Sequence, residues 1–308
     1  MSAHMKAAVY TKAASGKVLE IRELAQPVPK DNEVLLRVRA ASVNPLDWRM
    51  KRHQPGVDVA GEIVGIGRSV TQFKPGDAVF GAGKGAFAEY ACAPETSLFA
   101  KPQSVTFEQA AAVPVAGLTA LQGLRDKGHL QPGQKVLING ASGGIGTFAV
   151  QIAKSLGADV TGVCSTKNIE LVRSLGADRV IDYTDSDFTQ ESQRYDLLLD
   201  NVGNRQLSAM RRILTPNGKC VMAGAPKHLW SVLSRLFKAY AWSPLLKQKF
   251  IFFIARMRRD DLTTLCSLIQ AGKVAPVIDR CYPLSEAAAA LAYGEEGHAR
   301  AKVVITVP

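Results

Sequence analysis

The sequence lacks paired cysteines, metal-binding motifs and long apolar runs. Its five cysteines stand far apart, and none forms the C-x-x-C pair that is typical of zinc ribbons and redox sites. No apolar run reaches the roughly 18 residues that span a bilayer, and the N-terminal stretch has no apolar signal region. These absences exclude a disulfide scaffold and a helical membrane protein, and we expect a cytoplasmic protein. The 308 residues can form two domains with their own cores.

Acidic residues are scarcer than basic ones. The chain has 38 Lys and Arg against 27 Asp and Glu, a net charge of +11. Such a surface favours anionic partners, which include phosphorylated cofactors, nucleic acid and anionic membranes. The alternative is a solvated surface that only keeps the protein soluble.

The first third of the chain has the pattern of short β-strands. Apolar stretches recur between turn signals such as Lys74-Pro-Gly-Asp77. We expect strands at Lys6–Tyr10, Val34–Val43, Val57–Ile66, Asp77–Phe80 and Phe87–Ala93. Strands of this length and spacing predict a barrel or a sandwich.

From Pro114 onward, the pattern changes to strands that alternate with helices. Strands are expected at Lys135–Asn139, Asp159–Cys164, Arg179–Asp182, Tyr195–Asp200 and Gly218–Ala223. This alternation predicts an α/β fold with a doubly wound parallel sheet. The tail returns to strand character. We therefore assign residues 1–114 and 272–308 to one domain and residues 115–271 to a second.

A glycine-rich loop lies between the strand at Lys135–Asn139 and the helix expected after it. Its residues are Gly140, Ala141, Ser142, Gly143, Gly144, Ile145 and Gly146. Glycines let the backbone approach a pyrophosphate closely, and a helix N-terminus offers free N–H groups and a partial positive charge. The loop predicts a dinucleotide site, and the alternative is an ordinary βα turn.

The second strand of this domain lacks an acidic residue at its end. After Cys164 come Ser165, Thr166 and Lys167. NAD-binding proteins usually place a carboxylate there, about 20 residues after the loop, to bind the ribose 2′-hydroxyl. A lysine with two hydroxyls can instead bind a 2′-phosphate through charge-assisted hydrogen bonds. The sequence predicts NADPH as the cofactor, and the alternative is that Lys167 is a solvated residue at a helix start.

Several motifs along nearly the whole chain resemble those of one family. They are Ala41-Ser-Val-Asn44-Pro-Leu-Asp47-Trp48, Pro55-Gly-Val-Asp58-Val-Ala-Gly61, Phe87-Ala-Glu89-Tyr90, Ala116-Gly-Leu-Thr119-Ala, the glycine-rich loop, Asp200-Asn201-Val202-Gly203 and Lys302-Val-Val-Ile-Thr306. Together they resemble the zinc-free quinone oxidoreductase (zeta-crystallin-like) branch of the medium-chain dehydrogenases/reductases. The resemblance implies a GroES-like β-barrel catalytic domain, a Rossmann domain that binds NADPH, and a homodimer.

The resemblance also implies which residues surround the cofactor. It places Asn44 and Thr119 near the nicotinamide, and Ser165, Lys167 and Tyr183 near the adenosine 2′-phosphate. The residues that it places along the cofactor cleft are Asn201, Val202, Gly203, Phe252 and Phe253. The stretch Lys51–Pro55, which borders the substrate in relatives, is shorter than is usual in the family.

Zinc-dependent relatives differ from this chain at the positions of their metal ligands. They carry a cysteine where this chain has Asn44, and a His-Glu pair where it has Val57-Asp58. They also have a cysteine-rich lobe that this sequence lacks. Its histidines, among them His53 and His129, are scattered. Because zinc needs a closed set of ligands, usually His and Cys, the sequence predicts metal-free chemistry.

We expect hydride transfer from NADPH to a quinone or to the β-carbon of an α,β-unsaturated carbonyl, promoted mainly by positioning. Asn44 is a candidate to hydrogen-bond the acceptor oxygen or to orient the nicotinamide ribose. Asp47 is a candidate proton relay, with a turn or capping role as the alternative. Water is another source of the proton.

Two other functions remain open on the sequence alone. The segment Lys227–Arg259 has no acidic residue and mixes aromatic with basic side chains. It is compatible with an NADPH-binding protein that contacts RNA or an anionic membrane, and also with a buried cleft or dimer contact. A zinc-free alcohol dehydrogenase is the other alternative, although nothing evident would stabilise an alkoxide.

Overall fold

The computed structural model describes residues 4–13, 16–223, 247–297 and 299–308. The chain forms two compact units: unit 1 holds Met1–Val115, Met257–Gln270 and Pro276–Pro308, and unit 2 holds Ala116–Arg256 and Ala271–Ala275. The domains expected from the sequence differ mainly at residues 257–270, which we assigned to the second domain. Arg259 of this segment contacts unit 1: its guanidinium lies 5.7 Å from the ring centre of Phe99 and donates to Gln72.

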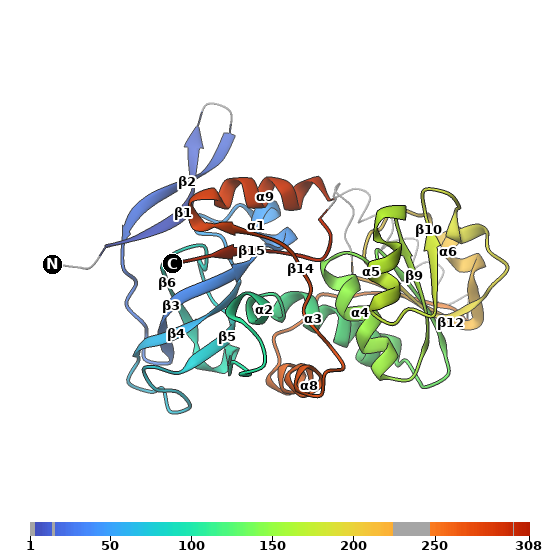
Figure 1. Ribbon diagram of the computed structural model, residues 1–308, viewed down its shortest axis with the longest axis horizontal. Helices are drawn as coiled ribbons and strands as arrows, with labels where there is room; N and C mark the ends of the chain where they lie inside the picture. The colour runs from blue at the N-terminus through green and yellow to red at the C-terminus, as the bar shows by residue number, and fades with distance from the viewer. Residues whose placement is uncertain (1–3, 14–15, 224–246, 298) are drawn as a thin grey trace. The chain divides into compact units, whose positions relative to one another are not determined.

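Unit 1 is built mainly of antiparallel strands (Figure 1). β1 (His4–Ala13) and β2 (Gly16–Ala25) form a hairpin. A seven-stranded sheet has the order β14-β15-β3-β4-β5-β7, with β6 also paired to β3. Its strands are β3 (Glu33–Ser42), β4 (Asp58–Ile66), β5 (Ala78–Ala82), β6 (Tyr90–Pro94), β7 (Leu98–Ala100), β14 (Ile278–Pro283) and β15 (Lys302–Thr306).

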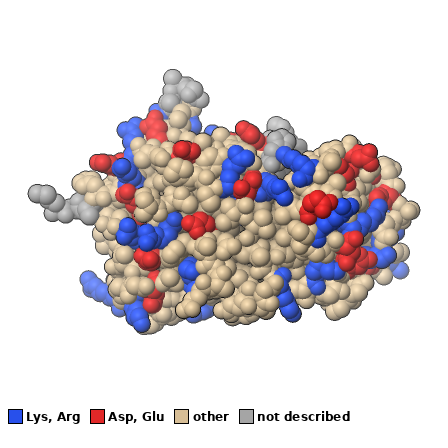
Figure 2. Space-filling model, viewed as in Figure 1, with Lys and Arg blue, Asp and Glu red and all other residues tan. Residues whose placement is uncertain are grey.

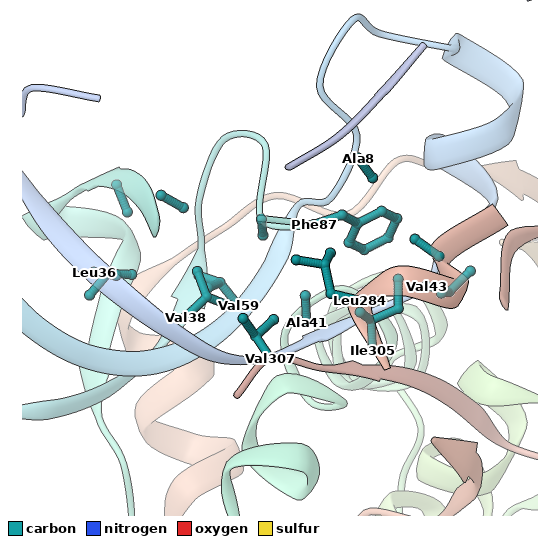
Figure 3. Packing of buried hydrophobic residues seen from close by; sticks show 14 of the residues in the cluster. Ala8, Leu36, Val38, Ala41, Val43, Val59, Phe87, Leu284, Ile305 and Val307 are labelled. Atoms are coloured by element: carbon teal, nitrogen blue, oxygen red, sulfur yellow. The ribbon is translucent and has the colours of Figure 1, made fainter. Parts of the chain in front are cut away.

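The core of unit 1 comes from alternate residues of these strands. Leu36 and Val38 of β3 and Ile305 of β15 are buried in one apolar cluster (Figure 3). Side chains two positions apart lie on the same face of a strand, so each strand contributes every second residue. The helices of unit 1 are α1 (Pro45–Met50), α2 (Phe107–Ala111), α8 (Arg259–Gln270) and α9 (Ala287–Glu296).

The C-terminal strand returns to the first part of the chain. β15 pairs antiparallel with β3, and Val304 lies opposite Ser42. The tail that was expected to rejoin the first domain thus lies in unit 1. Strands β2 and β7 were not predicted. In β2 the apolar and charged residues do not alternate regularly, since Val18 and Leu19 are adjacent and so are Arg22 and Glu23. Its side chains are half-buried or exposed, so neither a buried apolar run nor a period of two marks the strand.

Unit 2 contains a six-stranded parallel sheet of order β10-β9-β8-β11-β12-β13. The strands are β8 (Lys135–Asn139), β9 (Asp159–Cys164), β10 (Arg179–Asp182), β11 (Tyr195–Asp200), β12 (Leu214–Met222) and β13 (Lys249–Phe252). This is the doubly wound order of a Rossmann sheet. The predicted bounds of β8, β9, β10 and β11 agree with the structure. β8, β9 and β11 are short, mostly apolar runs in the interior of the sheet, and β10 lies at its edge.

Helices connect these strands. They are α4 (Gly144–Ser155), α5 (Ile169–Ser174) and α6 (Leu207–Arg212), preceded by α3 (Pro114–Leu121) and the π-helical segment η2 (Gln122–Gly128). The short 3₁₀ turns are η1 (Glu95–Ser97), η3 (Thr166–Asn168), η4 (Phe188–Gln190) and η5 (Leu284–Glu286). Within the described ranges, none of the helices is long and apolar enough to cross a membrane.

Gly146 sets how closely α4 approaches the end of β8. A Cβ at this position would lie 2.1 Å from the carbonyl oxygen of Gly140, a distance that real structures do not allow. The variant Gly146→Ala should therefore lose about 3 kcal/mol of unfolding free energy through overpacking. Chemical denaturation would measure this loss. A variant as stable as the parent would show that the turn between β8 and α4 is not tightly packed.

Candidate active site

The glycine-rich loop forms a backbone cradle between β8 and α4. Gly140 has a φ of +79°, which favours glycine, and its N–H donates to the carbonyl of Val163 in β9. Gly143 precedes the first turn of α4 in an extended conformation. A Cβ at Gly143 would contact only the Gly140 carbonyl oxygen, at 3.4 Å, so the space beside this residue is open. The first N–H groups of α4 have no acceptor within the helix and can bind an anion.

The end of β9 carries the predicted 2′-phosphate residues. Ser165 follows β9, and Thr166 and Lys167 lie in the exposed turn η3. Tyr183 joins them because its N–H donates to Cys164 at 3.0 Å, and its side chain is 47% exposed. The structure thus brings these four residues to one corner of unit 2.

An acidic side chain also lies at this corner. Asp182 ends β10 and accepts hydrogen bonds from the N–H and hydroxyl of Thr184. Hydrogen bonds from Thr166 and Thr184 lower the pKa of Asp182. The sequence analysis found no acid at the end of the second strand. This one comes from the third strand, and only the pairing of β9 with β10 places it there.

Asn168 connects the glycine-rich loop to the end of β9. Its amide nitrogen donates to the hydroxyls of Ser142, at 3.1 Å, and Ser165, at 3.2 Å. Its amide oxygen is buried and has no hydrogen-bond partner in the described residues. The sequence analysis missed this residue. An asparagine just before a helix usually indicates a cap, so no sequence signal separated this role from capping.

The turn after β11 presents an unsatisfied amide. One carboxylate oxygen of Asp200 accepts from the N–H groups of Val202 and Gly203, which shapes the turn. Asn201 lies between Asp200 and Val202. Its amide nitrogen and oxygen are both buried without a partner in the described residues. A Cβ on Gly140 would come within 3.7 Å of the Asn201 Cβ, so the two turns are adjacent. Buried polar groups normally have partners, so this amide fits a ligand such as NADPH.

The remaining predicted cofactor residues of unit 2 lie on other elements. Thr119 is buried in α3. Phe252 packs against the core of the parallel sheet, and the ring of Phe253 lies where a Cβ on Gly123 would meet it at 3.3 Å. Both phenylalanines are thus at least partly committed to packing, and their contact with the cofactor stays a prediction.

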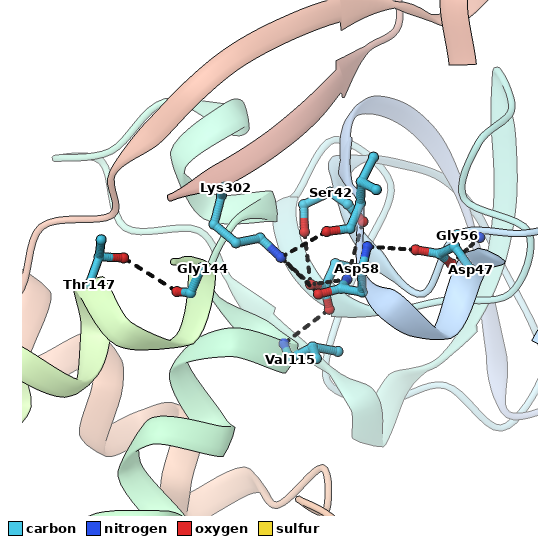
Figure 4. A network of polar contacts seen from close by, with 10 residues as sticks. Ser42, Asp47, Gly56, Asp58, Val115, Gly144, Thr147 and Lys302 are labelled. Atoms are coloured by element: carbon cyan, nitrogen blue, oxygen red, sulfur yellow. Dashed lines mark hydrogen bonds and ion pairs between the residues drawn. The ribbon is translucent and has the colours of Figure 1, made fainter. Parts of the chain in front are cut away.

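Unit 1 contains a buried polar network around Asn44 (Figure 4). The Asn44 amide nitrogen donates to an Asp58 carboxylate oxygen at 2.9 Å and to the Ser42 carbonyl at 3.2 Å. The Asn44 amide oxygen accepts from the Lys302 ammonium at 2.8 Å. Lys302 also donates to the Val43 carbonyl at 3.2 Å and lies 3.8 Å from the same Asp58 oxygen.

Asp58 is held by three hydrogen-bond donors. Besides Asn44, these are the Ser42 hydroxyl, at 2.8 Å, and the Val115 backbone N–H, at 3.1 Å. Burial raises the pKa of Asp58 and lowers the pKa of Lys302, while the opposite charge of each group counteracts the shift of the other. Because donors surround the Asp58 carboxylate and carbonyl oxygens surround the Lys302 ammonium, the geometry favours an ion pair.

Asp47 anchors the loop that follows α1. Its two carboxylate oxygens accept from the backbone N–H groups of Asn44, at 2.8 Å, and Gly56, at 2.9 Å. These contacts close the short stretch between α1 and β4 and favour the turn role over the relay role. Burial raises the pKa of Asp47 to about 6.

The raised pKa of Asp47 predicts a pH-dependent stability. The folded state binds this proton more tightly than the unfolded state, so the free energy of unfolding should fall as the pH rises from about 4 to about 6. In Asp47→Ala this contribution is absent. The difference between parent and variant should therefore decrease by about 2 kcal/mol between pH 4 and pH 7. Denaturant titrations at several pH values would measure it, and a difference independent of pH would contradict the shift.

Two family models match the chain. The alcohol dehydrogenase GroES-like domain matches residues 30–103, and a model described as zinc-binding dehydrogenase matches residues 175–305. The first match falls in unit 1. Together with the strand order of unit 2, it confirms the predicted fold class, a Rossmann doubly wound parallel sheet with a GroES-like β domain.

The second description raises the question of zinc. In the part of the chain that the structure describes, no three side chains of His, Cys, Asp or Glu gather into a metal-binding group. The network around Asn44 offers an amide oxygen and a carboxylate, but the Lys302 ammonium lies between them. Its positive charge opposes a second cation, and the network offers no His or Cys ligand. These residues do not fit zinc.

Known proteins resemble the chain along most of its length. It is 35% identical to the chloroplast envelope quinone oxidoreductase homolog of Arabidopsis thaliana, over 96% of this chain and 95% of that protein. It is 32% identical to the NADPH-dependent alkenal/one oxidoreductase, chloroplastic, of the same plant, over 98% and 79%. The solved quinone oxidoreductase of Coxiella burnetii superposes with a TM-score of 0.88 at 28% identity, over 99% and 100%. The chain belongs to the quinone oxidoreductase-like branch of the medium-chain dehydrogenase/reductase family.

Proposed function

We propose that this protein is an NADPH-dependent oxidoreductase that transfers a hydride to a quinone or an α,β-unsaturated carbonyl. The observation that carries the proposal is the backbone cradle at Gly140–Gly146 beside the buried amide of Asn201, which has no hydrogen-bond partner among the described residues. Two of the relatives above are named for quinone and alkenal/one reduction, and one of these names specifies NADPH. The shared family and the cradle of this chain support the same chemistry here.

The cofactor, when bound, supplies the hydride, and the residues of this chain bind and orient it. The loop from Gly140 to Gly146 would hold the pyrophosphate at the N-terminus of α4. Asn201 would pair its amide with a polar group of the cofactor. Ser165, Thr166, Lys167 and Tyr183 would hold the 2′-phosphate, with Lys167 supplying the charge. The nearby Asp182 carboxylate opposes an anion, which makes the lysine more important.

Asn44 is suited to accept a hydrogen bond. Both of its amide protons are used by Ser42 and Asp58. Within the described residues its oxygen accepts one hydrogen bond, from Lys302, and a carbonyl oxygen can accept two. The oxygen of a quinone or an enone only accepts hydrogen bonds, so Asn44 does not suit it. A ribose hydroxyl can donate. Of the two roles that the sequence left open, orientation of the nicotinamide ribose is therefore favoured, with water as the source of the proton.

The other candidate functions have weaker support. Much of the basic segment Lys227–Arg259, up to residue 246, lies outside the described residues. On the face drawn in Figure 2, Lys and Arg are interspersed with Asp and Glu, so this face offers no broad basic patch for RNA or a membrane. Alcohol oxidation needs a group that stabilises an alkoxide, and the donors around Asn44 are already paired.

The assembly and the location of the protein stay predictions. We expect a homodimer on the basis of the family resemblance. A cytoplasmic location was expected from the sequence, but several relatives are named chloroplastic or mitochondrial.

The central experiment is NADPH oxidation by the purified protein with a panel of quinones and enones. We expect turnover with at least one acceptor and slower turnover with NADH. Binding of NADPH without oxidation by any acceptor would reject the enzyme and favour a binding protein. Reduction of NADP⁺ by simple alcohols, with no activity on the panel, would instead establish alcohol oxidation.

Lys167→Ala tests the cofactor preference. Losing one charge-assisted hydrogen bond should raise the Kd of NADPH about tenfold, since a tenfold change corresponds to about 1.4 kcal/mol. The Kd of NADH should stay unchanged, because NADH has no 2′-phosphate. Lys74→Ala removes an exposed lysine from unit 1 and serves as the matched control for net charge. Equal weakening of NADPH binding in both variants would assign the effect to overall charge.

Gly143→Ala tests the cradle. The new methyl group would have room in the folded protein, so thermal stability should be nearly unchanged. It would fill the space beside the loop and should raise the Kd of NADPH by at least about tenfold. Gly65→Ala, at a strand position where a Cβ makes only an ordinary contact with Leu35, is the control. Unaltered NADPH binding in Gly143→Ala would place the pyrophosphate elsewhere.

A further inference from the structure

Lys302 is a buried cation that the chemistry above does not use. It begins the apolar strand β15, and its side chain is 4% exposed. An unpaired buried ammonium is costly. Two oxygen atoms satisfy it by hydrogen bonds, the Val43 carbonyl and the Asn44 amide oxygen. The Asp58 carboxylate is its counter-ion, at 3.8 Å. A nonpolar residue here would complete the apolar pattern of the strand, so the lysine needs an explanation beyond packing.

The network fixes which way the Asn44 amide points. A lysine ammonium only donates hydrogen bonds, so the amide oxygen must face Lys302. An ionised carboxylate only accepts, so the amide nitrogen must face Asp58. Rotating the amide by half a turn would place its N–H groups against the Lys302 ammonium and its oxygen against the Asp58 carboxylate. Neither pair can form a hydrogen bond, and both are buried. The two opposite charges therefore select one orientation of a side chain that could otherwise adopt two.

We propose that Lys302 is a positioning residue that holds the Asn44 amide with its oxygen available to a hydroxyl donor of the cofactor. This rests on the proposed function, because it assumes that Asn44 meets the nicotinamide ribose. Asp58 fixes the same orientation by accepting a hydrogen bond from the Asn44 amide nitrogen. Without Lys302, the amide loses the partner that distinguishes its oxygen from its nitrogen, and a fraction of molecules would present N–H groups to the cofactor.

The competing explanation is that Lys302 only neutralises the buried Asp58. Two substitutions of similar size separate the explanations. Lys302→Met and Lys302→Gln both remove the charge, so both leave Asp58 without its counter-ion. Only the glutamine retains an N–H that can donate to the Asn44 oxygen. Charge neutralisation predicts that the two variants behave alike, whereas positioning predicts that glutamine restores activity.

The test measures steady-state kinetics with NADPH and the best quinone found for the parent protein. In Lys302→Met, kcat/KM for NADPH should fall about tenfold to a hundredfold, the size expected for a misplaced cofactor contact. The KM of the quinone should stay within about twofold of the parent value, because the lost contact is to the cofactor. Lys302→Gln should recover a large part of the loss. Equal losses in both variants would overturn the proposal.

A double-mutant cycle provides the second readout. If Lys302 acts through Asn44, Lys302→Met should cause no further loss in a protein that already carries Asn44→Ala. Losses that multiply would show that Lys302 acts independently of Asn44 and would reject the positioning role. Thermal unfolding of every variant identifies general destabilisation.

If Lys302→Met does not fold, the same comparison can be made in a protein that also lacks the buried carboxylate. Asp58→Asn removes the charge that would be left unpaired. In this background, Met and Gln at position 302 are compared again, with the same expected rescue and the same overturning result. Failure of the proposed function looks different, because the parent protein itself would not oxidise NADPH. An active parent with an equally active Lys302→Met would reject only the role of Lys302.

Discussion

A buried ammonium that must be surrounded by oxygen atoms organises unit 1. Lys302 lies at the start of the C-terminal strand, and its partners lie at the end of β3 and the start of β4. Removing a charge from water costs free energy unless hydrogen bonds and an opposite charge replace the water. The network therefore requires that β15 pair with β3, and it ties residues from opposite ends of the chain into one site.

Unit 2 differs from unit 1 in how its buried polar groups are paired. Around Asn44 nearly every donor and acceptor is paired within the protein, whereas Asn168 and Asn201 keep buried amide atoms without a partner in the described residues. Both asparagines adjoin the glycine-rich loop or the strand end beside it. Because unpaired buried polar atoms destabilise a protein, their clustering there is consistent with a site that a polar ligand completes. In our proposal, unit 1 thus holds a fully paired network that positions Asn44, and unit 2 holds a site whose polar atoms are paired only when the cofactor binds.

The charges around Asn44 differ from those of a zinc site. A divalent cation among cysteine and histidine ligands would bind and polarise a substrate oxygen directly. Here Lys302 supplies a monovalent cation that is bound to the protein on several sides. Such a cation orients neighbouring groups more readily than it polarises a substrate. This agrees with chemistry in which the cofactor supplies the reactivity and the protein supplies the geometry.

Short apolar runs, glycine spacing and family motifs in the sequence determined the Rossmann sheet, the glycine-rich turn between β8 and α4, and the family. Runs such as Lys135–Asn139 and Tyr195–Asp200 have no other way to bury both faces, so their bounds could be predicted. Strand β2, in which charged and apolar residues follow no regular period, could not. The tertiary structure alone decided the pairing of Asn44 with Asp58 and Lys302 and the positions of Asp182 and Asn168. Each depends on contacts between strands or loops distant in the sequence. Local patterns carry no information about such contacts, because they arise only when the sheets close.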